Sequence, residues 1–483
     1  MLKKILSFVV LSAVLFSCSS DGDSGRELKN YVASYLNGND RVAVFGSVNV
    51  KQFLDKTGYE GNDKLKVLIG TEINKVNSVM NIDQPLFYAI EGPFDKEGSP
   101  AAVHLFMKVK NKDSLIMELN DRSFDVTEKK DFAFTEDGDF VLGITNDLAI
   151  ATVRPDDYKA EEVVKSNLEA VKKEEIKGKA LEILESDGDV VIGLNIENLY
   201  GSSNTDLAKL DEVKKKEIES MVKDSYMMTV FRFENGEATM KIDHLFSDAL
   251  MNEMFFRKDP SNSIFNKLNK GDGIMLGGAA MNLDINKLES FMQKYSPETL
   301  GTISSQLGMG GGMMSILGSE KVISKLSDGQ MGVGLFGNPI ENSFGVNTFY
   351  GTTDSGKMLF SLVQDQLPPA DYEYKEDGVY GNFSMSLEGG EKSNNSMKLP
   401  KGCEGFGKDG ITAFLSFQDI DLEEFGFEGE MKLVEIVDYA TFSYGNEGGI
   451  LYIKAKEGQE NILKQALDVV MESLMSNIAN IVI

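Results

Sequence analysis

The residue pattern most suggestive of chemistry is a glycine-containing stretch at 351–358, with the sequence GTTDSGKM. It fits the first seven positions of the phosphate-binding loop GxxxxGK, whose backbone N–H groups and lysine contact phosphate. The eighth position should be Ser or Thr to hold magnesium, but here it is Met358. A related stretch at 110–115, KNKDSL, has no glycine and no lysine after Ser114. Both place Asp-Ser before an expected helix, so we interpret the pattern as helix capping and predict no nucleotide binding.

Patterns for metal binding are weak. The chain contains two histidines, His104 and His244, and neither has a second ligand at helical or hairpin spacing. Zinc requires three or four nitrogen or sulfur ligands, so we interpret both histidines as structural. Acidic turns at 136–139 and 187–189 could supply oxygen atoms to calcium, but Asp-Gly is ordinary turn chemistry. The sequence therefore predicts no metal and no cofactor.

Patterns for hydrolysis are equally sparse. The chain has no GxSxG and no HExxH motif, and Cys403 is a thiol without a nearby histidine. Paired carboxylates that cleave a glycan or peptide remain an alternative, but 76 Asp and Glu residues make any single pair unspecific. We predict that the protein is not an enzyme.

The composition is strongly acidic. Lys and Arg total 49 against 76 Asp and Glu, which gives a formal net charge of −27. This balance excludes nucleic acid as a partner, because phosphate binding needs clustered basic residues. It also disfavours electrostatic binding to anionic lipid head groups. The apolar fraction of 42% predicts a folded chain rather than a disordered one.

The N-terminal residues 1–17 are typical of a secretory signal peptide. Lys3 and Lys4 precede an apolar run at 5–16, which is too short for a membrane span of about 20 residues. The tetrapeptide Leu-Phe-Ser-Cys at 15–18 resembles a bacterial lipobox, in which the cysteine is acylated and becomes the mature N-terminus. We therefore predict lipid attachment at Cys18 and membrane anchoring through it; the alternative is an unlipidated signal peptide with an incidental cysteine.

The remaining chain contains two recurring patterns. One is an apolar β-type run followed by a helical pattern, and the other is two β-type runs followed by an amphipathic helix. The first pattern occurs at 40–54, 188–200, 271–291 and 409–425, and the second at 85–119, 226–255, 330–363 and 439–474. In two copies of the first pattern, Asp284 and Asp421 stand where a helix N-cap is expected.

The order of these patterns repeats once along the chain, so that Val42 corresponds to Ile274 and Val190 to Ile411. We predict an α+β fold with two homologous halves, each a mainly antiparallel sheet covered by helices. The predicted organisation is a signal peptide at 1–17, a lipid-anchored tether at 18–39, a first half at 40–258 and a second half at 264–483. In strands such as VAVFGSV, apolar residues stand at both odd and even positions, which point to opposite faces of a sheet. This predicts at least one strand that is buried on both faces.

The lipobox, the length and the repeated strand-then-D-x-x-x-L pattern resemble a family of Bacteroidota-type lipoproteins known only as a domain of unknown function. The resemblance implies an exported outer-membrane lipoprotein, and the acidic residues at 20–23 resemble a surface-export tag. It supplies one functional residue, the acylated Cys18.

The sequence thus favours a lipid-anchored cell-envelope protein that serves as a binding or assembly module for an envelope protein or extracellular ligand. The alternative is an envelope hydrolase acting through paired carboxylates. A Gly/Met-rich run at 307–314 is interpreted as an insertion loop; the competing interpretation is an adaptable apolar contact site.

Overall fold

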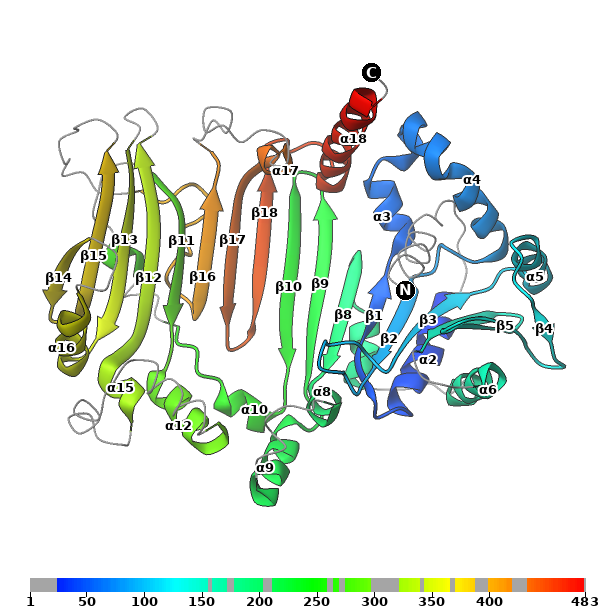
Figure 1. Ribbon diagram of the computed structural model, residues 1–483, viewed down its shortest axis with the longest axis horizontal. Helices are drawn as coiled ribbons and strands as arrows, with labels where there is room; N and C mark the ends of the chain where they lie inside the picture. Colours follow the sequence, from blue (N-terminus) through cyan, green and yellow to red (C-terminus); the bar gives the residue numbers. More distant parts are fainter. Residues whose placement is uncertain are drawn as a thin grey trace. The chain divides into compact units, whose positions relative to one another are not determined.

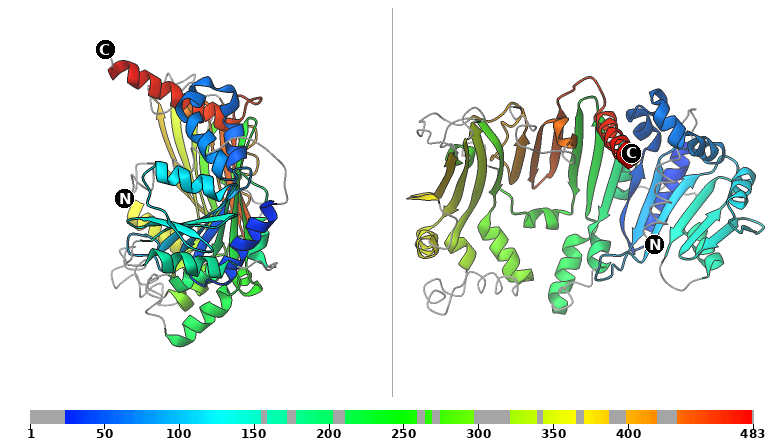
Figure 2. Two further views of the ribbon diagram at one scale, coloured as in Figure 1. Left: turned by 90° about the vertical axis from the view of Figure 1, so that its right-hand side faces the viewer. Right: turned by 45° about the horizontal axis from the view of Figure 1, so that its top comes forward.

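The computed structural model describes most of the chain, which divides into two compact units (Figures 1 and 2). The described residues are 24–154, 159–171, 178–202, 211–258, 264–268, 274–296, 321–338, 343–364, 370–386, 398–418 and 432–481. Unit 1 comprises residues 24–235, 242–247 and 460–468 among these, and unit 2 comprises the others. The predicted boundary at 259–263 lies outside the described residues.

Unit 1 is built on an antiparallel sheet with the strand order β4-β5-β6-β7-β3-β2-β1-β8-β9. Its strands are β1 Val42–Val48, β2 Leu86–Glu91, β3 Ala102–Lys108, β4 Thr127–Glu128, β5 Ala133–Asp137, β6 Phe140–Ile144, β7 Leu148–Val153, β8 Val190–Asn195 and β9 Tyr226–Glu234. Its helices are α2 Ser24–Asn37, α3 Val50–Lys56, the 3-10 turn η1 Tyr59–Gly61, α4 Asp63–Val79, α5 Lys112–Asp121, α6 Ala160–Ala170, α7 Lys179–Leu184, α8 Ile196–Ser202 and α9 Glu212–Val222.

Unit 2 is built on a second antiparallel sheet with the order β14-β15-β13-β12-β11-β16-β17-β18. Its strands are β11 Ile274–Asn282, β12 Ser327–Asn338, β13 Ser343–Thr352, β14 Asp371–Lys375, β15 Gly378–Ser386, β16 Ile411–Ser416, β17 Val437–Gly445 and β18 Gly448–Ala455. Its helices are α10 Asp248–Glu253, α11 Ile264–Leu268, α12 Ile285–Tyr295, α15 Val322–Leu326, α16 Asp354–Val363 and α17 Lys432–Glu435. Strand β10 (Glu237–Leu245) and helix α18 (Ile462–Ile481) each have residues in both units.

Helices and antiparallel sheets in both units confirm the predicted α+β class. The order β3-β2-β1-β8-β9 in unit 1 recurs as β13-β12-β11-β16-β17 in unit 2. A duplication would produce this correspondence, but the duplication itself stays a prediction. Asp284 caps α12 as expected, since its side chain accepts a hydrogen bond from the Lys287 N–H at 3.1 Å. Asp421 lies outside the described residues.

The main core of unit 1 lies between one face of its sheet and helices α2 and α7. Phe87 of β2 lies directly opposite Phe106 of β3, and Phe45 of β1 lies on the same face. These three rings are essentially inaccessible to solvent and pack against Ile183 of α7 and the apolar face of α2. Because successive strand residues point to opposite faces, the neighbours of these rings, among them Leu86 and Met107, lie on the other side.

Helix α2 corrects the predicted tether at 18–39. Its apolar residues recur with the spacing of one helical face and are almost fully buried: Leu28, Tyr31, Val32, Tyr35 and Leu36. Residues 24–37 are therefore part of the folded core of unit 1, and the segment left to act as a tether ends before Ser24.

Strands of unit 1 are buried on both faces, as the apolar residues at both odd and even positions predicted. One of them is β7, in which Leu148, Ala149, Ile150, Ala151 and Thr152 are each at most 3% exposed. In the sheet, β7 lies between β3 and β6. Strand β1, with the sequence VAVFGSV that suggested this burial, is a second example: Val42 and Gly46 on one face and Ala43 and Phe45 on the other are buried.

The core of unit 2 lies on one face of its sheet. Phe336 of β12, Phe349 of β13 and Phe414 of β16 pack with Ile264 and Leu268 of α11, and with Cys403 and Phe406 from the segment before β16. In the described residues, no helix combines the length and the apolar character needed to cross a membrane.

We predict that Leu28→Ala in α2 lowers the free energy of unfolding by about 2–5 kcal/mol, because it opens a cavity in the core. The matched change Lys29→Ala, at the adjacent and partly exposed position, should alter it by no more than about 0.5 kcal/mol. Urea unfolding followed by circular dichroism measures both values. Equal effects of the two substitutions would mean that α2 is not part of the core.

Candidate functional site

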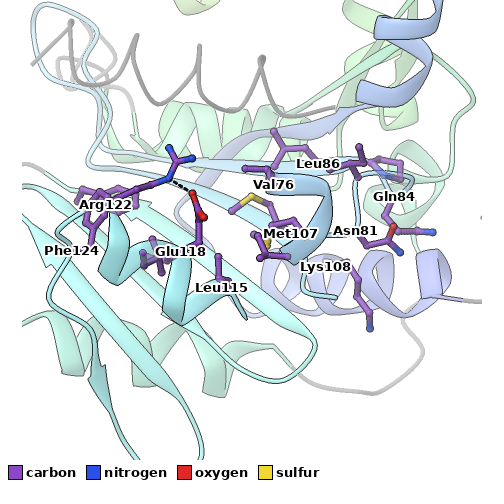
Figure 3. Close-up of a pocket in the computed structure, with 17 residues that line it drawn as sticks. Val76, Asn81, Gln84, Leu86, Met107, Lys108, Leu115, Glu118, Arg122 and Phe124 are labelled. Atoms are coloured by element: carbon purple, nitrogen blue, oxygen red, sulfur yellow. Dashed lines mark hydrogen bonds and ion pairs between the residues drawn. The ribbon is translucent and has the colours of Figure 1, made fainter. Parts of the chain in front are cut away.

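An apolar pocket lies in unit 1 between helices α4 and α5 and the sheet (Figure 3). Its volume is about 130 Å³. The lining side chains come from α4 and the segment after it, from strands β2, β3 and β6, and from α5 and the turn that follows it. They are Val76, Val79, Met80, Asn81, Ile82, Gln84, Pro85, Leu86, Met107, Lys108, Leu115, Glu118, Leu119, Arg122, Phe124, Phe140 and Leu142.

The position of α4 beside the sheet is fixed by backbone hydrogen bonds at its C-terminal end. The Asn81 N–H donates to the Lys108 carbonyl at 2.7 Å, and the Lys110 N–H donates to the Val79 carbonyl at 2.9 Å. Met80 also forms an isolated antiparallel bridge with Val109. These hydrogen bonds hold the chain after α4 against the end of β3. The last turn of α4, with Val76 and Val79, therefore lines the pocket.

The position of α5 follows from its start and from its helical spacing. The Asn111 side chain accepts a hydrogen bond from the Ser114 N–H at 2.9 Å and caps the helix. Leu115, Leu119 and Arg122 then recur at the spacing of one helical face and line the pocket.

A charged group lies at one side of the pocket. The Arg122 guanidinium contacts the carboxylate of Glu118 at 2.7 Å and that of Glu72 at 2.6 Å. Burial alone would lower the pKa of Arg122, but the hydrogen bonds to the two carboxylates raise it above its ordinary value. The hydrogen bond from Arg122 lowers the pKa of Glu72. Glu118 is the one carboxylate among the residues that line the pocket, and it is bound to Arg122.

The size and lining of the pocket define what it can hold. An engineered protein cavity of about 150 Å³ with an apolar lining stays dry and binds benzene. The unit 1 pocket is slightly smaller and similarly apolar, so it fits an apolar group of about the size of a benzene ring. It offers no pair of carboxylates for acid–base catalysis.

A second polar cluster is buried on the opposite face of the unit 1 sheet. Glu91 Oε1 lies 2.7 Å from the Tyr35 hydroxyl, 2.6 Å from Asn39 Nδ2 and 3.1 Å from His104 Nε2. His104 Nδ1 lies 3.0 Å from Thr152 Oγ1, and His104 is 2% exposed. Burial would raise the pKa of Glu91, but the hydrogen bonds with His104, Tyr35 and Asn39 lower it to about 2. None of these residues lines the pocket.

This cluster shows His104 as a hydrogen-bonded core residue. The other histidine, His244 of β10, stacks on Phe246 with ring centroids 4.4 Å apart. Within the described residues, no group of three or more His, Cys, Asp or Glu side chains is placed to hold a metal ion.

The phosphate-loop pattern forms a helix cap. Thr353 caps α16 by accepting the Gly356 N–H at 3.3 Å. Lys357 Nζ donates to Asp354 Oδ1 at 3.1 Å and to the Glu376 carbonyl at 2.8 Å. The capping residues are Asn111 in α5 and Thr353 in α16, so the Asp-Ser pairs lie inside these helices rather than at the cap.

Two other sequence candidates have different outcomes. Cys403 is 2% exposed in the core of unit 2, and burial raises the pKa of its thiol to about 12, so it is protonated at neutral pH. Cys18 and the Gly/Met run at 307–314 lie outside the described residues.

Sequence reasoning missed the pocket residues. The apolar positions of α4, among them Leu65, Ile73 and Val76, carry a helical period that could have identified this helix. The pocket itself arises because α4 and α5, which are separated by β2 and β3 in the chain, pack on the same sheet.

Comparisons with known proteins define no family for this chain. No protein-family model matches it, and no curated protein matches it. Among solved structures, crystal form I of TP0453 is 10% identical with a TM-score of 0.20, over 77% of this chain and 95% of the other. Crystal form III of TP0453 is 9% identical with a TM-score of 0.20, over 71% and 90%. Likeness at this level supports no conclusion about fold or function.

We predict that the ionised carboxylate of Glu91 stabilises the folded protein at neutral pH, and that this stabilisation is lost in acid. Its pKa falls from an ordinary value of 4.5 to about 2 on folding, so its contribution is present above about pH 5 and is lost as the pH falls toward 2. The corresponding change is on the order of 3 kcal/mol.

Urea unfolding of the wild type and Glu91→Gln at pH 7, 5, 4 and 3 measures this contribution. The free energy of unfolding should fall more steeply with decreasing pH in the wild type than in Glu91→Gln. The exposed control Glu97→Gln should keep the wild-type slope. Parallel slopes for the wild type and Glu91→Gln would contradict the assignment.

Proposed function

We propose that this protein is a lipid-anchored protein of the bacterial cell envelope that acts without catalysis and binds an apolar ligand in the unit 1 pocket. The observation that carries the proposal is the pocket itself, which is apolar on most of its lining and matches a ring-sized apolar group. The ligand is an apolar side chain of an envelope protein or an apolar extracellular compound.

The same pocket disfavours the alternative of a hydrolase with paired carboxylates. Glycoside cleavage uses two carboxyl groups about 5–10 Å apart on either side of the scissile bond. Glu118 stands alone among the lining residues, and its ion pair with Arg122 at 2.7 Å uses the carboxylate as a structural partner. Glu72, the second acid bound to Arg122, does not line the pocket and is likewise held in an ion pair, at 2.6 Å.

We predict that toluene binds in the pocket and shifts the NMR signals of the methionine methyl groups that line it. Met80 and Met107 line the pocket, whereas Met117 of α5 is 66% exposed and does not. Titration of the methyl-labelled protein with toluene should therefore move the first two signals and leave the third unchanged.

The variant Val76→Phe should abolish these shifts, because the added ring fills the space that toluene occupies. Met117→Phe adds the same ring at an exposed position of α5 and should preserve the shifts of Met80 and Met107. If toluene moves all three methionine signals equally, or none, the pocket is not a binding site.

The lipid anchor has support from the lipobox ending at Cys18 and from the position of α2. Because α2 begins at Ser24, the residues between it and Cys18 span at most about 20 Å when fully extended. Acyl chains on Cys18 would hold the core of unit 1 within this distance of the outer membrane. This is a much shorter connection than the predicted tether at 18–39.

Metabolic labelling with an alkyne-bearing palmitate tests the anchor. We expect the label on the wild type and on the control Cys403→Ala, and none on Cys18→Ala, because acylation of the lipobox requires the cysteine thiol. Labelled Cys18→Ala protein would show that the anchor lies elsewhere.

A further inference from the structure

The face of the unit 2 sheet opposite its core carries two cross-strand rows of uncharged side chains. Residues that lie directly opposite one another on neighbouring strands share a face, so the strand registers define each row. The first row is Phe383, Val346, Leu335, Gly277, Leu415, Ala440 and Ile453, and the second is Gly381, Thr348, Val333, Ala279, Ala413, Phe442 and Leu451. We call these two rows the open face.

The open face differs from the rest of the chain in composition. Charged residues make up 26% of the sequence, but none occurs in either row, and Thr348 is the one side chain there that forms hydrogen bonds. The sheet positions between these residues, such as Phe336, Phe349 and Phe414, point to the opposite face and form the core.

The open face is exposed. Leu415 is 54% exposed, Val333 and Leu335 are each 40% exposed, and Phe383 is 38% exposed. Helix α16 reaches the row beyond the open face, where the Phe360 ring lies 5.1 Å from that of Tyr350. In that next row Val379 is 3% exposed. Among the described residues, the helix therefore contacts the border of the open face, while Leu415, Val333, Leu335 and Phe383 within it remain exposed.

The dimensions of the open face argue against a second copy of the chain as its partner. Seven strands at about 4.8 Å spacing span about 29 Å, and two rows cover about 14 Å along the strands, which gives about 400 Å². A stable interface buries about 800 Å² on each partner, twice this area. Two copies, each with a net charge of −27, would also repel one another.

The chemistry of the open face also disfavours a folded protein partner. Protein interfaces make about one hydrogen bond for every 100–200 Å², and the open face offers the hydroxyl of Thr348 alone. Hydrocarbon needs neither hydrogen bonds nor charges. The acidic chain surrounding the open face excludes attraction to anionic head groups, so a lipid surface that matches it is zwitterionic.

From these observations we propose that the open face of unit 2 docks on the hydrocarbon boundary of a zwitterionic lipid bilayer. Phe383, Leu335 and Leu415 enter between the lipid head groups, and the strands lie along the membrane surface. This docking is separate from the unit 1 pocket and does not depend on acylation of Cys18.

The test uses the unacylated Cys18→Ala chain and vesicles of phosphatidylcholine. Because the chain contains no tryptophan, Leu335→Trp introduces a single reporter on the open face, and Val213→Trp places one at a 69% exposed position of α9 in unit 1. We expect vesicles to shift the emission of Leu335→Trp to the blue and to leave that of Val213→Trp unchanged.

Vesicle flotation provides the second measurement. The double variant Leu335→Glu/Leu415→Glu should lose at least tenfold in vesicle binding, whereas Val213→Glu should bind as the Cys18→Ala chain does. Circular dichroism verifies that the variants are folded. Absence of flotation, equal loss in both variants, or a dimer in sedimentation that Leu335→Glu converts to monomer would each overturn the proposal.

Discussion

The structure depends on one constraint: several strands of each sheet carry apolar residues on both faces. Alternate strand residues point to opposite faces, so each sheet must bury two apolar surfaces or leave one in contact with something other than water. Among the described residues, Cys403 is a free buried thiol. In unit 1, α2 and α7 cover one face, and α4 and α5 pack on the other beside the pocket. In unit 2, α11 and the segment containing Phe406 cover one face, and the open face remains exposed.

Apolar packing alone would allow α2 to slide or rotate on the sheet, and the buried Glu91 cluster removes this freedom. Its donors come from different elements: Tyr35 from α2, Asn39 from the turn after α2, and His104 from β3. A buried carboxylate that loses a partner is costly, so a shift of α2 that breaks its two contacts, from Tyr35 and Asn39, is disfavoured. We infer that this cluster fixes the register of the helix, while the surrounding rings supply most of the burial.

The sequence predicted those features that depend on local periodicity. The strand-then-helix patterns at 40–54, 188–200 and 271–291 occur where expected, whereas the helical part of the copy at 409–425 lies outside the described residues. Asp284 caps its helix because its side chain reaches an N–H three residues later. A helical turn at 27–36 was expected within the tether, but the burial of helix α2 in the core was not, because Ser24–Asn37 is polar in overall composition. The caps at Asn111 and Thr353 were assigned to neighbouring Asp-Ser pairs, because local preference does not decide which of several adjacent polar residues begins a helix. The pocket and the open face could not be predicted, since both depend on which distant elements pack on which sheet face.

The same order of strands supports different surfaces in the two units. Helix α5 follows β3 and α16 follows β13, and each starts at a residue that accepts an N–H from three positions later. In unit 1 a second helix, α4, packs beside α5, and a small pocket lies between the helices and the sheet. In unit 2 α16 contacts Tyr350, and Val333 and Leu335 of the open face are exposed. A small pocket selects an apolar group by its size, whereas an exposed row of side chains selects an extended apolar surface. The coverage of the second sheet face, rather than the order of strands, therefore determines what each unit can bind.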